Sequence, residues 1–218
     1  MKLLLTSAGF TNKSIANALL ELCGRPFSEL KLIFIPTAAN VEEGGKEWLI
    51  DDLYNCKKLG FKQIDICDIA AVSKQIISKR LHEANVIAVG GGDPFYLLRW
   101  IKKVGLNKDF QEYLKDKIYV GLSAGSVIMG DSLFLATDSL LNYEKTGKLN
   151  FTKGLGFVNL IVRPHLNSIF RTKITVDYLS NFVKKTKSPV YAIDDQSAVK
   201  VDGDKIEVVS EGTWKKFN

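Results

Sequence analysis

The chain has 218 residues and a formal net charge of +6, with 46% hydrophobic and 25% charged residues. This composition is ordinary for a globular protein with a sizeable core, and no apolar run reaches the roughly 18 residues that cross a membrane. Three cysteines without a Cys-x-x-Cys pair, and only two histidines, argue against a disulfide framework and the usual zinc sites. The short apolar start MKLLLTSAGF indicates a first strand rather than a secretion signal, so we expect a cytoplasmic protein.

Short apolar runs alternate along the chain with amphipathic segments. Helices are predicted where apolar residues recur at helical spacing, as Ile15, Leu19 and Leu22 do. The predicted helices cover residues 12–24, 42–60, 73–84, 94–105 and 172–186, and the predicted strands cover 2–6, 32–36, 63–67, 86–89, 118–122, 158–162 and 190–193. Near the end, Asp202-Gly203-Asp204 separates two β-rich runs, 198–201 and 206–209, which predicts an antiparallel hairpin.

This alternation of short strands and helices predicts an α/β fold. Strands that are apolar on both faces are typical of a mostly parallel, doubly wound sheet covered by helices on both faces. The C-terminal antiparallel hairpin is expected to cap one edge of that sheet. No repeat, low-complexity segment or clear linker interrupts the chain, so a single α/β domain over residues 1–218 is expected.

The segment IYVGLSAGSVIMGD carries a Gly-x-Ser-x-Gly pattern at a predicted strand-to-helix junction. Gly121 and Gly125 would let the chain bend sharply and hold Ser123 at the edge of the sheet where open α/β sheets bind ligands. The helix that follows would place the Ala124 N–H beside Ser123, ready to stabilise an oxyanion. Small residues that merely let a strand and a helix pack closely are the alternative, and the pattern alone leaves both open.

A serine nucleophile needs a general base, because its hydroxyl is only weakly acidic at neutral pH. The chain offers two histidines. His82 lies in a predicted helix with a charged outer face and is expected to be exposed. His165 follows an apolar strand directly after Pro164, where an α/β site collects its side chains, and is the candidate base.

Three aspartates are candidates for the acid that would orient His165 and stabilise its imidazolium. Asp194 and Asp195 follow the strand predicted at 190–193, and side-chain alternation should send them in opposite directions. Asp138 lies between the serine and the histidine in the chain, which is the order of triad residues in α/β-hydrolases. Asp195 and Asp138 both stay open as the acid.

The segment VIAVGGGDPFYLLRW places three glycines between a strand and a helix. It has neither the Gly-x-Gly-x-x-Gly spacing nor a Walker lysine, which argues against a phosphate-binding loop. An oxyanion hole needs two N–H donors, and the turn after Ser123 supplies only that of Ala124. Gly91 or Gly92 is therefore expected to supply the second donor.

The segments VGGGDPFYLL, GLSAGSVIMG, RPHLNS and AIDDQSAV, in this order and at these distances, resemble the dipeptidase E and cyanophycinase family of serine peptidases. The resemblance covers essentially the whole chain and implies a fold similar to that of the class I glutamine amidotransferases. It implies Ser123 as the nucleophile, His165 as the base, oxyanion donors around Gly91 and Ala124, and no metal or organic cofactor.

Two departures from this family bear on specificity. Its glycine loop often reads Gly-Gly-Gly-Asn-Thr, where this chain has Asp93-Pro94, and the segment after His165 is shorter than in dipeptidase E. Dipeptidase E uses an arginine there to recognise an N-terminal aspartate, and Arg171 is the candidate for this role. The predicted function is a serine exopeptidase for short peptides, with acidic N-terminal residues as the candidate preference and strict Asp-x specificity left open.

Three other functions stay open. A related amide hydrolase of the cyanophycinase type would use the same residues on another substrate. A non-catalytic α/β binding protein would leave His165 Nε2 beyond hydrogen-bond reach of Ser123 Oγ. Nucleic-acid binding is suggested by net charge alone, and the lysines are scattered without interleaved aromatics. The expected partner is a short peptide substrate, and neither nucleic acid nor a membrane is expected as a partner. The protein itself is expected to be a monomer or a homodimer.

Overall fold

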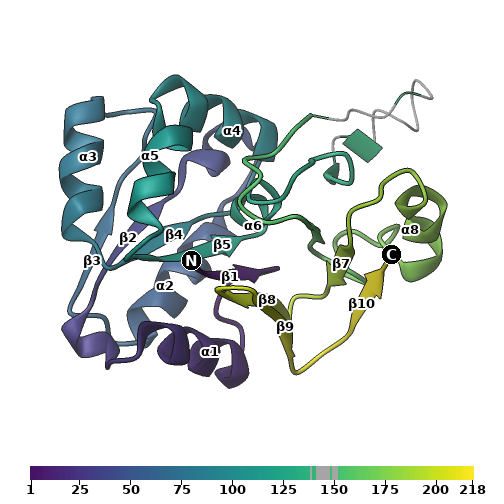
Figure 1. Ribbon diagram of the computed structural model, residues 1–218, viewed down its shortest axis with the longest axis horizontal. Coiled ribbons are helices and arrows are strands. Elements are labelled where there is room, and N and C mark those ends of the chain that lie inside the picture. The colour runs from purple at the N-terminus through teal and green to yellow at the C-terminus, as the bar shows by residue number, and fades with distance from the viewer. Residues whose placement is uncertain (138, 141–147, 149–151) are drawn as a thin grey trace.

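A seven-stranded sheet forms the centre of the molecule (Figure 1). The computed structural model describes residues 1–137, 139–140, 148 and 152–218. The strands of this sheet are β1 (Lys2–Thr6), β2 (Lys31–Ile35), β3 (Gln63–Ile66), β4 (Val86–Val89), β5 (Ile118–Leu122), β8 (Ser197–Asp202) and β9 (Lys205–Ser210). Their order is β3-β2-β4-β5-β1-β8-β9; the first five run parallel, and the hairpin β8–β9 pairs antiparallel with β1 at one edge.

Helices cover both faces of this sheet. Helices α1 (Lys13–Cys23) and α2 (Glu47–Lys58) lie on one face, and α3 (Lys74–Glu83), α4 (Pro94–Lys103), α5 (Leu106–Tyr113) and α6 (Ala124–Val127) lie on the other. Helix α8 (Val176–Val183) packs away from this sheet, and 3-10 turns lie at Phe27–Glu29 and Thr37–Val41. Side-chain alternation in β1 sends Leu4 into a core shared with α1 and α2, and sends Leu3 and Leu5 into a core shared with α3, α4 and α5. The predicted doubly wound α/β fold with a C-terminal hairpin is thereby confirmed.

The helices begin where the sequence provides a cap. Asn12 accepts a hydrogen bond from the Ile15 N–H at the start of α1, and Asp93 accepts one from Tyr96 at the start of α4. Helix α5 lies outside the predicted helices, the nearest of which covers residues 94–105. Gly105 has φ 82° and lets the chain turn and start a new helix at once. Over the ranges that the structure describes, no helix is both long enough and apolar enough to cross a bilayer.

A second, three-stranded sheet was not predicted. It has the order β10-β7-β6, with β6 at Ile161–Arg163, β7 at Val190–Ile193 and β10 at Trp214–Phe217, and it packs with α8 around a third apolar core. The strand predicted at 158–162 therefore begins later and belongs to this small sheet. Residues 157 and 158 instead donate their N–H groups to the Met129 carbonyl, which keeps them beside the turn that follows α6.

Close backbone packing fixes the junction between β5 and α6. A Cβ on Gly125 would overlap the Val89 carbonyl oxygen of β4. A Cβ on Gly121 would lie 2.6 Å from the Ser126 nitrogen, which is closer than real Cβ contacts. Both glycines of the Gly-x-Ser-x-Gly pattern are therefore required by space rather than by φ, and they let the helix start directly against the sheet.

We predict that Gly125→Ala destabilises the protein by about 1–3 kcal/mol, because the added methyl forces β4 and α6 apart. The matched control is Gly45→Ala, whose Cβ would meet only the flexible end of Glu47. Urea unfolding of both variants measures the difference. Equal unfolding free energies for the two variants would contradict the packing account of this junction.

Candidate active site

Ser123 lies at the turn between β5 and α6, at the carboxyl edge of the parallel strands. Its backbone has φ 47° and ψ −104°, a conformation that costs an L-residue about 1–3 kcal/mol. The Ser123 N–H donates to the Thr6 carbonyl at 3.1 Å, and the Ser126 hydroxyl donates to the same carbonyl at 2.7 Å. The end of β1 therefore holds the strained turn from both sides.

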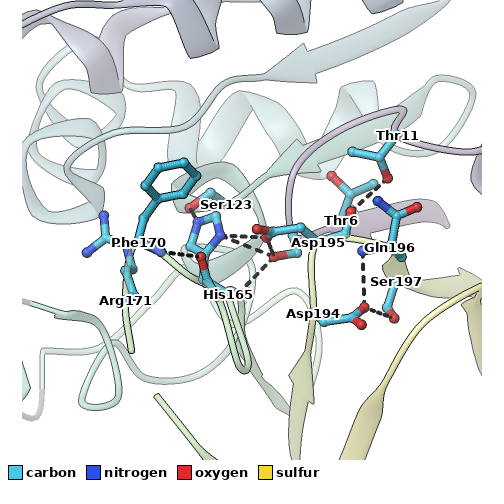
Figure 2. Close-up of polar contacts among 12 residues, drawn as sticks. Thr6, Thr11, Ser123, His165, Phe170, Arg171, Asp194, Asp195, Gln196 and Ser197 are labelled. Atoms are coloured by element: carbon cyan, nitrogen blue, oxygen red, sulfur yellow. Dashed lines mark hydrogen bonds and ion pairs between the residues drawn. The ribbon is translucent and has the colours of Figure 1, made fainter. Parts of the chain in front are cut away.

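His165 lies against the Ser123 hydroxyl, with its Nε2 2.9 Å from Ser123 Oγ (Figure 2). On the other side of the ring, Nδ1 lies 2.7 Å from Asp195 Oδ1. An ionised carboxylate only accepts hydrogen bonds, so Nδ1 carries the proton and Nε2 accepts from the serine. A non-catalytic binding protein should lack this contact between Nε2 and the serine. The observed distance therefore argues against the non-catalytic alternative.

Among the described residues, Asp195 is the aspartate that lies against His165. Burial raises the pKa of Asp195, but the hydrogen bonds from His165 and Ser7 lower it by more than burial raises it. The pKa of Asp195 is therefore below its ordinary value, and the group is ionised at neutral pH. The neighbouring Asp194 accepts hydrogen bonds from the Ser197 hydroxyl at 2.6 Å and the Gln196 N–H at 3.0 Å (Figure 2). Asp138, the other candidate acid, lies outside the described residues.

Backbone N–H groups adjoin the serine on the side of the glycine loop. A Cβ on Gly91 would lie 3.5 Å from the Ser123 Cβ, so the Gly91 backbone is its neighbour. Gly92 and Ala124 line the same cavity as Ser123. The N–H groups of Gly91, Gly92 and Ala124 have no acceptor among the residues that the structure describes. An oxyanion hole needs at least two N–H groups of this kind.

The cavity at Ser123 has a volume of about 150 Å³ and a polar lining. A larger cavity of about 280 Å³, lined by Phe170, Ile174 and Tyr178 among others, shares Thr137 and Arg171 with it but does not reach Ser123. The smaller cavity therefore holds the reactive groups. Its other polar side chains are those of Glu42, Asp93, Thr137, Arg163 and Arg171.

Two arginines form one wall of this cavity. Arg163 is only 2% exposed, and its Nη2 donates to Thr137 Oγ1 at 3.4 Å, while Arg171 Nη1 donates to the same oxygen at 3.1 Å. The Nε of Arg163 has no partner, and neither arginine has a carboxylate partner among the described residues. Burial and the nearby Arg171 lower the pKa of Arg163 to about 9, which leaves its charge in place at neutral pH. A buried cation of this kind is costly unless an anion joins it.

Sequence reasoning missed four polar residues of the site: Ser7, Glu42, Thr137 and Arg163. The available signal for Arg163 was a charged residue at the end of an apolar strand, directly before Pro164 and the histidine. The other histidine, His82, is exposed on α3 with its ring 5.2 Å from that of Tyr113. In the described part of the chain, no group of His, Cys, Asp and Glu could hold a metal ion.

The chain is similar to known peptidases along most of its length. It matches the family model described as Peptidase family S51 over residues 3–209. It is 31% identical to an uncharacterized peptidase of Listeria innocua, over 79% of this chain and 81% of that protein. It is 27% identical to a Drosophila melanogaster protein named "Probable alpha-aspartyl dipeptidase", over 63% of this chain and 58% of that protein. A crystal structure of a peptidase E-like protein from Listeria monocytogenes superimposes with a TM-score of 0.79 at 25% identity, covering 97% of this chain and 98% of the other.

We predict that Ser123→Gly stabilises the protein relative to Ser123→Ala by roughly 0.5–2 kcal/mol. Glycine adopts the turn without the Cβ strain, which is worth about 1–3 kcal/mol, and loses part of that gain through its freer unfolded chain. Alanine keeps the strain and serves as the control for the lost hydroxyl. Urea unfolding compares the two, and a glycine variant no more stable than the alanine variant would show that the turn stores no strain.

Proposed function

The chain belongs to peptidase family S51, and from this we propose that it is a serine exopeptidase which hydrolyses short peptides through Ser123, His165 and Asp195. The observation that carries the proposal is the continuous hydrogen-bond chain from Ser123 Oγ to His165 Nε2, 2.9 Å, and from His165 Nδ1 to Asp195 Oδ1, 2.7 Å. Nucleophile, base and acid in this arrangement are the elements of acyl transfer.

In the proposed reaction, Ser123 Oγ attacks the carbonyl carbon of the peptide bond while His165 Nε2 takes the hydroxyl proton. The tetrahedral oxyanion accepts hydrogen bonds from the N–H groups of Ala124 and of Gly91 or Gly92. His165 then gives its proton to the leaving nitrogen, the C–N bond breaks, and an acyl-enzyme remains on Ser123. Water attacks the ester carbonyl and gives a proton to His165, which returns it to Ser123 Oγ as the acid product leaves.

Asp195 supports this cycle by holding the histidine in one tautomer. Its carboxylate accepts the Nδ1 proton, so Nε2 stays free to take the serine proton, and its charge stabilises the imidazolium that forms. The lowered pKa of Asp195 keeps the group ionised across the neutral range. This geometry favours Asp195 over Asp138 as the acid.

We further propose that the site favours an acidic residue on the acyl side of the scissile bond. The buried guanidinium of Arg163 and the charge of Arg171 meet at Thr137 in the cavity that contains Ser123. A carboxylate placed there would satisfy the unpartnered Arg163 Nε and relieve the repulsion between the two cations. The name of the Drosophila relative points to the same substrate class.

The exopeptidase part of the proposal is supported by a carboxylate in the lining of the cavity. Its volume of about 150 Å³ is of the size of one amino-acid residue. Glu42 lines it, and its carboxylate forms no ion pair with any described residue, since Lys46 Nζ donates to the main-chain carbonyl of Glu42 at 2.8 Å. The Glu42 carboxylate can therefore accept the α-ammonium of a substrate. Asp93, the other acid in the lining, already caps α4 through its Oδ1.

The test is a dipeptide library assayed with the wild-type protein and with Ser123→Ala. The library includes Asp-, Glu-, Asn- and Leu-initiated dipeptides and an N-acetylated form of each. We expect hydrolysis of free-amine dipeptides by the wild type, and a loss of roughly 10³-fold or more in Ser123→Ala. Equal turnover by both proteins would refute the serine mechanism, and preferred cleavage of the acetylated forms would refute recognition of a free amino terminus.

The carboxylate preference has its own test. We predict that Arg163→Met and Arg171→Met each lower kcat/KM for an Asp-initiated dipeptide by roughly 10- to 100-fold, as expected when a hydrogen bond to a charged group is lost. Turnover of the matching Asn-initiated dipeptide should change little. Arg99→Met, on the exposed side of α4, is the control and should affect neither substrate. A parallel loss on both substrates would remove the arginines from carboxylate recognition.

A further inference from the structure

We propose that Ser7 is a positioning residue of the active site, which keeps the base His165 and the acid Asp195 correctly placed relative to the nucleophile Ser123. This inference rests on the proposed function of Ser123, His165 and Asp195. Ser7 follows β1 directly, is fully buried and was not singled out by any sequence motif.

The Ser7 hydroxyl contacts both partners of the nucleophile. It donates to Asp195 Oδ1 at 2.7 Å and accepts the backbone N–H of His165 at 2.8 Å. A serine hydroxyl has one proton and two lone pairs, so these two hydrogen bonds use its only donor and one acceptor site. The distance of 3.4 Å between Ser7 Oγ and His165 Nδ1 leaves the ring proton to Asp195, which is closer at 2.7 Å.

The position of Ser7 in the fold explains why such a link is needed. Ser123 follows β5 of the large sheet, whereas His165 and Asp195 follow β6 and β7 of the small sheet. The nucleophile therefore follows a strand of one sheet and the base a strand of the other, while Asp195 lies on the connection from β7 to β8 of the large sheet. A small shift between the sheets would lengthen the 2.9 Å contact of Ser123 with His165. A displacement of this kind is costly for catalysis even when the fold survives.

Thr6 and Ser7 link the three candidate triad residues through hydrogen bonds. The Thr6 carbonyl accepts the N–H of Ser123, and the next residue, Ser7, holds the backbone of His165 and the carboxylate of Asp195. Strand β1 lies between β5 and β8 in the large sheet (Figure 1). One short segment at the end of β1 thus sets the positions of all three residues.

The contact with the His165 N–H also bears on the backbone of the base. His165 has φ 63°, in the left-handed region that only glycine enters freely. The Ser7 oxygen satisfies the N–H of this residue, which would otherwise be left without an acceptor beside Asp195. Ser7 therefore holds the main chain of His165, and Asp195 holds its ring.

The test compares Ser7→Ala with Ser197→Ala. Ser197 is an equally buried serine at the same edge, and its hydroxyl bonds Asp194 and Ser210 rather than the candidate triad. We expect Ser7→Ala to lower kcat on the preferred dipeptide by roughly 10- to 100-fold with KM changed by less than about 3-fold, whereas Ser197→Ala keeps kcat within about 3-fold of the wild type. Equal losses of kcat in both variants, or a loss confined to KM in Ser7→Ala, would overturn the proposal.

Two further readouts separate positioning from loss of folding and from failure of the proposed function. The proton on His165 Nδ1, observed by NMR in the resting protein, should be protected from exchange in the wild type and in Ser197→Ala but not in Ser7→Ala. This signature requires no turnover, so it decides on Ser7 even for a protein inactive on every peptide tested. Labelling of Ser123 by a fluorophosphonate should slow by the same factor as kcat. An unchanged Nδ1 proton signal and labelling rate in folded Ser7→Ala would overturn the proposal.

Discussion

Ser123 turns the chain through a backbone conformation that L-residues avoid, and the neighbouring elements keep it there. The Thr6 carbonyl accepts hydrogen bonds from both the Ser123 N–H and the Ser126 hydroxyl, so the end of β1 stabilises the turn at Ser123. Glycine at position 125 lets α6 start against β4, where any Cβ would overlap the Val89 carbonyl. This arrangement leaves the serine hydroxyl at the sheet edge and within reach of a base, beside N–H groups that have no acceptor in the described part of the chain. Every other part of the site is positioned relative to that hydroxyl.

The base, the acid and the buried cation come from the small sheet. Strands β6 and β7 are parallel neighbours, so the residues that follow them meet although His165 and Asp195 are 30 positions apart in the chain. Arg163 ends β6 two residues before His165, which puts a cationic wall and the proton acceptor on one short segment. Specificity and reactivity are therefore coupled through β6, and the packing of the small sheet against the large one matters for both.

Local signals were sufficient to predict the fold class and to single out Ser123, His165 and the glycine loop, because each lies within a few residues of a strand end. The sequence left Asp195 and Asp138 open, since the choice depends on which strand ends meet in space. The small sheet was missed for a related reason: β10 pairs with β7 over a span of some twenty residues that no periodic pattern reveals. Arg163 looks ordinary in the sequence although it lies two residues before His165, and Ser7 is brought to His165 only by the contact between the two sheets.

The most direct test of the account is whether Ser123 becomes acylated during turnover. An aspartyl p-nitrophenyl ester, which acylates a serine enzyme faster than the acyl-enzyme hydrolyses, is mixed with the protein and quenched in acid within milliseconds. Intact mass and peptide mapping then locate any adduct. The predicted result is an aspartyl group on the peptide that contains Ser123, absent from Ser123→Ala. Release of p-nitrophenol with no adduct, or with an adduct on another residue, would contradict the nucleophilic role of Ser123.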